Sequence, residues 1–260
     1  MKYEFTYGAQ APHGRARGYL FVVSHMRSFS SLLCHILGSH REIAGYAEMH
    51  LAYSGRSDLL RLALNVELAT EAPVADRYVL DKILHSNYDI ASSVLGRLDV
   101  KVLLMLRNPD DTIPSILHMA RSLGNPVAAA NAVSYYENRL ARIDAVSQQV
   151  GRRALYLDAE SLLDRTEPVL DALSRWLGLA EPLSADYRTF KLSGEKGVGD
   201  PSAHILAGKV IADHSERHRD YVPVAIPDGL LQRARELYRA LREALLARHP
   251  TVPPGDTARA

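Results

Sequence analysis

Hydrophobic and polar positions follow two patterns that alternate along the chain. Short, continuous apolar runs that contain β-branched residues predict strands buried on both faces, as in a parallel sheet. These runs span residues 18–25, 42–46, 76–84, 99–107 and 152–158. Helical spacing of apolar residues separates the runs and continues beyond them, over residues 28–38, 56–71, 111–122, 127–150, 166–177 and 228–248.

Strands that alternate with helices predict an α/β domain with a central, mostly parallel sheet of five strands. We expect one domain over residues 19–250, because no linker divides it. Polar residues and turn formers predict a flexible arm over 1–18 and a flexible tail over 251–260. Pro114 fits the helix over 111–122 only in its first turn. Ligands of such domains bind at the carboxyl ends of the strands, so residues that follow each strand carry the functional information.

Composition narrows the class of protein. The chain has 260 residues, of which 47 % are hydrophobic and 23 % charged, as in a globular protein with a sizeable core. The net charge of +1 argues against a nucleic-acid-binding protein. Cys34 is the single cysteine, which excludes an internal disulfide. No run has the length of a signal-peptide core or a membrane helix, so we expect a cytoplasmic protein without a transmembrane segment.

A serine-rich turn follows the first strand and leads into a helix. Its sequence is S-H-M-R-S-F-S-S-L-L, from Ser24 to Leu33. The N–H groups and the dipole of a helix N-terminus attract anions, and Arg27 and nearby serine hydroxyls can add donors. The alternative is a serine-capped helix with a solvated arginine. No G-x-x-x-x-G-K-[ST] loop occurs in the chain, which disfavours an ATPase or GTPase, and we predict no metal site.

A second candidate element follows the fourth strand. Arg107 and Pro109 end the apolar run, and Ser115 lies eight residues beyond the arginine. Pro109 re-aims the chain, so that Arg107 and Ser115 can hold a phosphate from two sides. The alternative is a surface arginine that pairs with Asp110 or Asp111.

Together the two elements resemble the cofactor signature of sulfotransferases that use 3′-phosphoadenosine 5′-phosphosulfate (PAPS). The resemblance implies that a loop of Arg27, Ser28, Phe29, Ser30, Ser31 and Leu32 holds the 5′-phosphosulfate. It implies that Arg107 and Ser115 hold the 3′-phosphate, and that a late loop with Lys196 and Gly197 closes over the nucleotide. The implied fold is a three-layer domain similar to P-loop nucleoside triphosphate hydrolases.

Further segments extend the resemblance over residues 19–209. His40 lies thirteen residues past Arg27, as the histidine after the first helix does in the family. The segments ALYLDAESLL and VLDALSRWLGL are similar to a family pattern in the second half of the domain. Two residues depart from the family: Arg41 replaces the proline after His40, and Phe29 stands where glycine is usual. We predict a negative φ at Phe29, which places it in the first helical turn.

The resemblance also implies roles in catalysis. Sulfuryl transfer needs cations and in-line positioning, as phosphoryl transfer does. Arg27 is the cation expected beside the leaving group, and Lys82, at the end of the third strand, is expected to stabilise the transition state. Three residues compete for the role of base: Glu48 is ranked first, and His50 and His85 are the alternatives, because imidazole titrates near neutral pH.

The predicted reaction moves a sulfuryl group from PAPS to a hydroxyl or amine and releases 3′,5′-adenosine bisphosphate (PAP). A small molecule, a carbohydrate or a lipid fits the sequence equally as acceptor, and a homodimer is allowed without being indicated. Two other functions compete. A kinase-like phosphotransferase would need Mg²⁺ ligands and usually the missing P-loop, and an inactive module would bind the nucleotide without turnover.

Overall fold

The computed structural model describes residues 12–191, 193–194, 203–212 and 226–252. A sheet of five parallel strands forms its centre, in the order β2-β3-β1-β4-β5. The strands are β1 (Gly18–Val23), β2 (Ile43–Ala44), β3 (Tyr78–Ile83), β4 (Val100–Leu106) and β5 (Ala154–Asp158). The predicted α/β class and the parallel five-stranded sheet are therefore confirmed.

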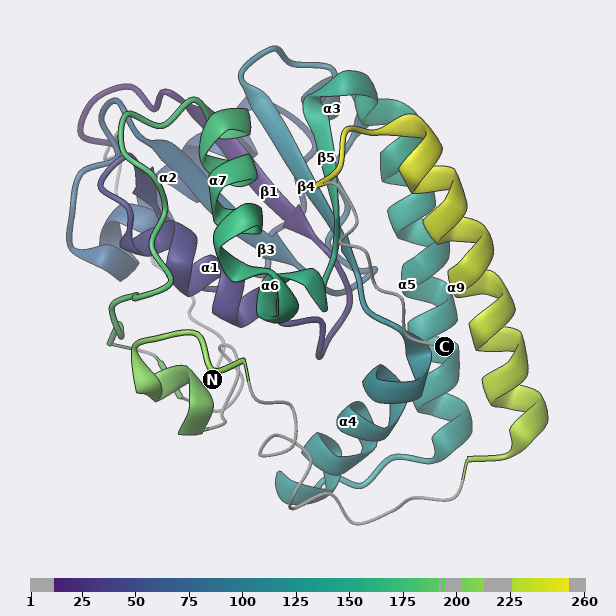
Figure 1. Cartoon of the computed structure of the whole chain (residues 1–260). Coiled ribbons are helices and arrows are strands. Elements are labelled where there is room, and N and C mark those ends of the chain that lie inside the picture. Colours follow the sequence, from purple (N-terminus) through teal and green to yellow (C-terminus); the bar gives the residue numbers. More distant parts are fainter. Residues whose placement is uncertain (1–11, 192, 195–202, 213–225, 253–260) are drawn as a thin grey trace.

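Helices cover both faces of the sheet (Figure 1). The described elements are α1 (Ser30–Ser39), α2 (Arg56–Thr70), α3 (Ser92–Leu95), α4 (Pro109–Ser122), α5 (Ala129–Val150), η1 (Gly151–Arg153), α6 (Ser161–Asp164), α7 (Thr166–Leu177), η2 (Ala203–Ala207) and α9 (Asp228–Arg248). One apolar core lies between the sheet and α2, α3, α4, α5 and α9, and the other between the sheet and α1, α6 and α7. The predicted three-layer arrangement is therefore confirmed.

Alternation along β3 decides which core each of its side chains enters. Val79 and Ile83 lie in the core with α2 and α5, and Leu80 lies in the core with α1. Successive side chains of a strand point to opposite faces. Asp81 therefore faces the α2 and α5 side, whereas Lys82 faces α1.

The predicted elements appear with small shifts at their ends, and α4 contains a correction. This helix begins at Pro109 rather than at residue 111, so Pro114 lies inside it and not in its first turn. Asn108 explains the earlier start, because its side chain accepts a hydrogen bond of 2.9 Å from the N–H of Asp111. Pro109 adds a preset φ at the first helical position. The helix continues through Pro114 without that residue's backbone donor.

The ends of the described chain are attached to the domain. The N–H of Arg17 donates to the carbonyl of Arg77, and the Arg17 guanidinium pairs with Glu42. At the other end, α9 lies along α5, and Arg242 donates to both carboxylate oxygens of Asp158 at 2.8 and 2.7 Å. Within the described residues, no helix combines the length and hydrophobicity that crossing a bilayer requires. The division into arm, domain and tail remains a prediction.

Candidate functional site

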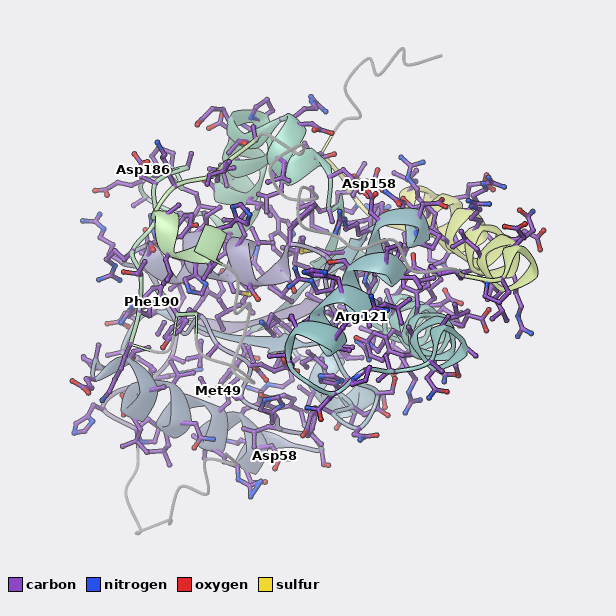
Figure 2. The ribbon with its side chains drawn as sticks, turned by 90° about the horizontal axis from the view of Figure 1, so that it is seen from below. Met49, Asp58, Arg121, Asp158, Asp186 and Phe190 are labelled. Atoms are coloured by element: carbon purple, nitrogen blue, oxygen red, sulfur yellow. The ribbon has the colours of Figure 1, made fainter. Side chains whose placement is uncertain are left out.

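The predicted site residues that the structure describes lie at or after the carboxyl ends of β2, β3, β1 and β4, which are adjacent in the sheet. Because these strands are parallel, their carboxyl ends meet at one edge, and the chain segments that leave them lie close together. Figure 2 views the molecule from below, with Met49 on one side of this region and Arg121 of α4 on the other.

The loop between β1 and α1 contains two residues in the left-handed region. Arg27 has a φ of 63°, and Phe29, the N-cap of α1, has a φ of 60°. The prediction of a negative φ at Phe29 is therefore wrong. The reversal from β1 into α1 needs this conformation at the position, and a non-glycine residue adopts it at a cost of about 1–2 kcal/mol. The Phe29 ring packs beneath the Arg107 guanidinium, 4.3 Å from ring centroid to Cζ, and this contact offsets part of the strain.

Serine hydroxyls inside the loop hold its shape. Ser28 is buried and its hydroxyl donates to the carbonyl of His25 at 2.7 Å. The Ser24 hydroxyl lies 2.6 Å from that of Ser28 and 3.0 Å from the carbonyl of Met105 on β4. The Ser28 side chain therefore fixes the loop. Leu32, also predicted to bind the cofactor, turns its side chain into the core with α7.

Hydrogen bonds join the two predicted phosphate-binding elements. Arg27 Nε donates to the Ser115 hydroxyl at 2.9 Å. Arg107 Nη1 donates to the carbonyl of Arg27 at 2.9 Å, and Arg107 is almost completely buried. The alternative pairing of Arg107 is present as an ion pair of 3.5 Å with Asp111, although the guanidinium itself is buried. The loop after β1 and the start of α4 therefore form one cationic group.

A second cation lies on the α1 side of the sheet. Lys82 is 1 % exposed, and its Nζ donates to the Ser31 hydroxyl at 3.0 Å. Ser31 and the buried Ser30 belong to the first turn of α1, where the leading N–H groups have no acceptor within the helix. An ammonium group and a helix N-terminus therefore lie together, which is an arrangement that attracts anions.

His25 connects the loop to β4 as a neutral ring. The Arg107 N–H donates to Nε2 at 3.0 Å, and Nδ1 lies 2.9 Å from the Met26 carbonyl. Nδ1 therefore carries the proton. Burial lowers the pKa of His25 to about 3, and the nearby charge of Arg139 adds to this effect.

Residues on α5 join the same strand ends, and sequence reasoning did not assign them to the site. Tyr135 accepts from the N–H of Met26 and donates to the carbonyl of Leu84. Tyr136 donates to the carbonyl of Arg107. Arg139 is buried and donates to the carbonyls of Ser24 and Ile83 at 2.8 to 3.1 Å. An arginine on the buried face of a helix was the signal that could have indicated this role.

The three candidate bases lie together. Glu48 Oε1 is 3.7 Å from His50 Nδ1 and 3.9 Å from His85 Nε2. The Glu48 side chain is 8 % exposed, and Oε1 is buried without a hydrogen-bond donor among the described residues. Burial lowers the pKa of His85, and the charges of Arg139 and Lys82 act in the same direction, whereas the charge of Glu48 raises it. The group of three candidate bases therefore lies close enough to Arg139 and Lys82 for their charges to act on it.

The late loop and His40 are the two remaining parts that the resemblance named. Lys196 and Gly197 lie outside the described residues. His40 is buried beside α1, and its Nε2 lies 3.1 Å from the carbonyl of Glu181, so its contacts there are structural. Among the described residues, no group of three or more histidine, cysteine, aspartate or glutamate side chains has the geometry of a metal site.

The chain shares its fold with sulfotransferase domains. The sulfotransferase domain from the curacin biosynthetic pathway superposes with a TM-score of 0.59 at 17 % identity, over 86 % of this chain and 98 % of that chain. The sulfotransferase domain of the olefin synthase of Synechococcus PCC 7002 gives 0.56 at 19 % identity, over 90 % and 98 %. A sulfotransferase from Alicyclobacillus acidocaldarius gives 0.50 at 16 % identity, over 91 % and 97 %.

Comparison of sequences adds no family. No protein-family model matches the chain, and no curated protein matches it. At identities this low, the structural similarity establishes the fold alone, so any statement about function depends on the residues of the site.

Proposed function

We propose that the protein transfers a sulfuryl group from PAPS to a hydroxyl or amine of a small-molecule, carbohydrate or lipid acceptor. One observation carries the proposal: two cationic groups flank the start of α1. Arg107, Arg27 and Ser115 form the first group, and Lys82 and Ser31 form the second. A donor with a 3′-phosphate and a 5′-phosphosulfate offers one anion to each group.

Each group has a distinct task in this reaction. Arg107 and Ser115 hold the 3′-phosphate, and the hydrogen bond from Arg27 to Ser115 supports a place for Arg27 between the two anions. Lys82 and the first turn of α1, with Ser30 and Ser31, stabilise the negative charge that develops on the moving group and the leaving phosphate. Hydrogen bonds within the protein hold Arg27, Arg107 and Lys82 in place before PAPS binds. Less reorganisation is then needed in the transition state.

The acceptor binds on the side of Glu48. The hydroxyl oxygen of the acceptor bonds to sulfur while Glu48 takes the hydroxyl proton. The bond from sulfur to the phosphate oxygen breaks at the same time and releases PAP. The buried Oε1 of Glu48, which has no hydrogen-bond donor in the described part of the chain, supports this role, because an acceptor hydroxyl would supply one. His50 and His85 are the alternative bases, and both are more exposed than Glu48, at 43 % and 37 %.

Calorimetry with PAP tests the nucleotide site. We expect PAP to bind in the presence of a metal chelator, because the proposed contacts are protein cations and backbone N–H groups. Preference for Mg-ATP over PAP would overturn the proposal in favour of a kinase. Incubation with PAPS and a panel of acceptors, followed by mass spectrometry for a gain of one sulfuryl group, then distinguishes an enzyme from an inactive nucleotide-binding module.

A further inference from the structure

Asp81 is a carboxylate buried inside a sheet of apolar strands. It lies on β3 between Leu80 and Lys82 and is 1 % exposed. Its side chain faces the α2 and α5 side, away from Lys82 and α1, as the alternation along β3 requires. The Asp81 carboxylate is therefore not part of the cationic group of Lys82 and Ser31, although Asp81 and Lys82 are neighbours in sequence.

The Asp81 carboxylate connects β3 to the segment that carries Glu48. Oδ1 accepts from the N–H of Met49 at 2.9 Å and from its neighbour Lys82 N–H at 2.7 Å. Oδ2 accepts from the Tyr53 hydroxyl at 2.5 Å. Met49 is the residue directly after Glu48, and it lies at the edge shown in Figure 2. One side chain therefore holds both ends of the segment from Met49 to Tyr53.

Stability alone does not account for a carboxylate at this position. Burial raises the pKa of Asp81 to about 7, and the charge of Glu48 adds to the effect, whereas the Tyr53 and backbone hydrogen bonds oppose it. Apolar residues of similar volume are often as stable in such a place as a buried charge. The carboxylate supplies what an apolar residue lacks, an acceptor for the backbone N–H next to Glu48.

The segment needs such a contact because its backbone is strained. His50, one residue beyond Met49, has a φ of 53°. A non-glycine residue keeps a left-handed conformation only when its surroundings hold it there. The bond from Met49 to Asp81 lies between Glu48 and this strained residue, so it determines the direction in which both side chains leave the backbone.

We propose that Asp81 is the positioning residue for the acceptor base: through the Met49 N–H it holds Glu48 in its buried place beside His50 and His85. The inference rests on the proposed function, in which Glu48 takes the acceptor proton. Asp81 itself touches neither donor nor acceptor. We therefore expect Asp81 to affect turnover. Nucleotide binding should change little, because Lys82 and α1 lie on the opposite side of β3.

The decisive variant keeps the core filled and removes the Asp81 carboxylate, which is the acceptor for the Met49 and Lys82 N–H groups, together with the Tyr53 hydroxyl. Asp81→Leu combined with Tyr53→Phe leaves an apolar pair, and Tyr53→Phe alone is the matched control, because it retains both bonds to Oδ1. We expect kcat of the double variant to fall about tenfold or more from loss of orientation, with the affinity for PAP within about twofold of the parent protein. Asp81→Asn, whose Oδ1 can still accept from Met49, should restore most of the turnover.

A second measurement reports the position of Glu48 without any turnover. The charge of Glu48 raises the pKa of His85, so displacement of Glu48 must lower the His85 pKa, which NMR titration of the ring proton follows. We expect the double variant and Glu48→Gln to lower this pKa by similar amounts, and their combination to lower it no further. An unchanged His85 pKa in a folded double variant would overturn the positioning role, as would unchanged kcat.

Failure of the inference and failure of the proposed function give different results. If the parent protein does not bind PAP, the proposed function fails, and the His85 titration still decides whether Asp81 holds Glu48. If the parent protein binds PAP and turns over but the double variant loses PAP affinity in step with kcat, Asp81 acts on the whole fold and the inference is wrong. Thermal unfolding of the double variant at or above the parent temperature excludes simple destabilisation.

Discussion

The two sides of the candidate site hold their charges in opposite ways. On the proposed nucleotide side, Arg27, Arg107 and Lys82 each donate a hydrogen bond of 2.9 to 3.0 Å to a hydroxyl or carbonyl of the protein. On the proposed acceptor side, Glu48 faces two imidazoles at 3.7 and 3.9 Å, beyond hydrogen-bond distance, and its buried Oε1 has no donor among the described residues.

The difference is consistent with the proposed ligand of each side. Cations that are already oriented suit a ligand whose anions always have the same spacing, as in one nucleotide. A buried carboxylate oxygen with no donor among the described residues suits an incoming hydroxyl or amine. The comparison makes a prediction that can be broken: changes on one side should alter turnover, and changes on the other should alter nucleotide affinity.

The largest effect is expected for Glu48→Gln. The amide cannot accept a proton, so kcat should fall by about 10²–10⁴-fold, while PAP affinity stays within about twofold. Steady-state kinetics and calorimetry on the same preparation check both parts. His50→Gln and His85→Gln are the matched variants, and a larger loss of kcat in either of them would transfer the role of base to that histidine.

The converse effect is expected for Arg107→Ala. Removal of the buried guanidinium that we propose contacts the 3′-phosphate should weaken PAP binding by about 100-fold, corresponding to a charge-assisted interaction of about 3 kcal/mol. Arg121→Ala, which removes an exposed arginine of α4, the helix that follows Arg107, is the control and should bind PAP as the parent does. Equal losses in both variants would reduce the role of Arg107 to general electrostatic attraction.

His25, in the loop after β1, should make the stability of the protein depend on pH. The pKa of His25 is about 3 in the folded protein, below the ordinary value of 6.5. The unfolded chain therefore binds a proton at this histidine at a pH where the folded protein does not, so the His25 contribution to stability falls as pH drops below about 6.5. Between pH 7 and pH 5 this contribution should fall by about 2 kcal/mol. Denaturant unfolding of the parent and of His25→Gln measures it, and the variant should lack this component.

The smallest effects are expected at Phe29. Phe29→Ala keeps a side chain in the left-handed region and loses the ring, whereas Phe29→Gly loses the ring and relieves the strain. The glycine variant should therefore be more stable than the alanine variant by about 1 kcal/mol, as measured by denaturant unfolding. Both should bind PAP about threefold more weakly, because Arg107 loses the ring beneath it. Equal stabilities would show that the left-handed conformation at this position costs little.

Local pattern was sufficient for the elements and for much of the site. Continuous apolar runs placed all five strands, and helical spacing placed α7 and α9 at their observed bounds. The resemblance named Arg27, Arg107 and Ser115, which the structure brings together. Phe29 was misjudged because its φ follows from how α1 must leave β1, and Pro114 was misjudged because Asn108 starts the helix earlier.

Other residues had little local signal that separated site from core. Asp81 stands in an apolar strand, and Tyr135 and Tyr136 stand in a long amphipathic helix, where only Arg139, a charged residue on the buried face, stood out. Their importance comes from partners such as Met49, Leu84 and Ser24, which lie far from them in the chain. Spacing within one helix or strand cannot indicate these contacts.

The residue pattern alone established the α/β class and the strands and predicted the two candidate anion-binding elements, because hydrophobic periodicity and turn chemistry act over a few neighbouring residues. The order of the strands, the left-handed loop and the group formed by Glu48, His50 and His85 depended on the packed structure. A buried polar group must find a hydrogen-bond partner nearby. The order of the strands and the position of α5 at their carboxyl ends decide which partner that is.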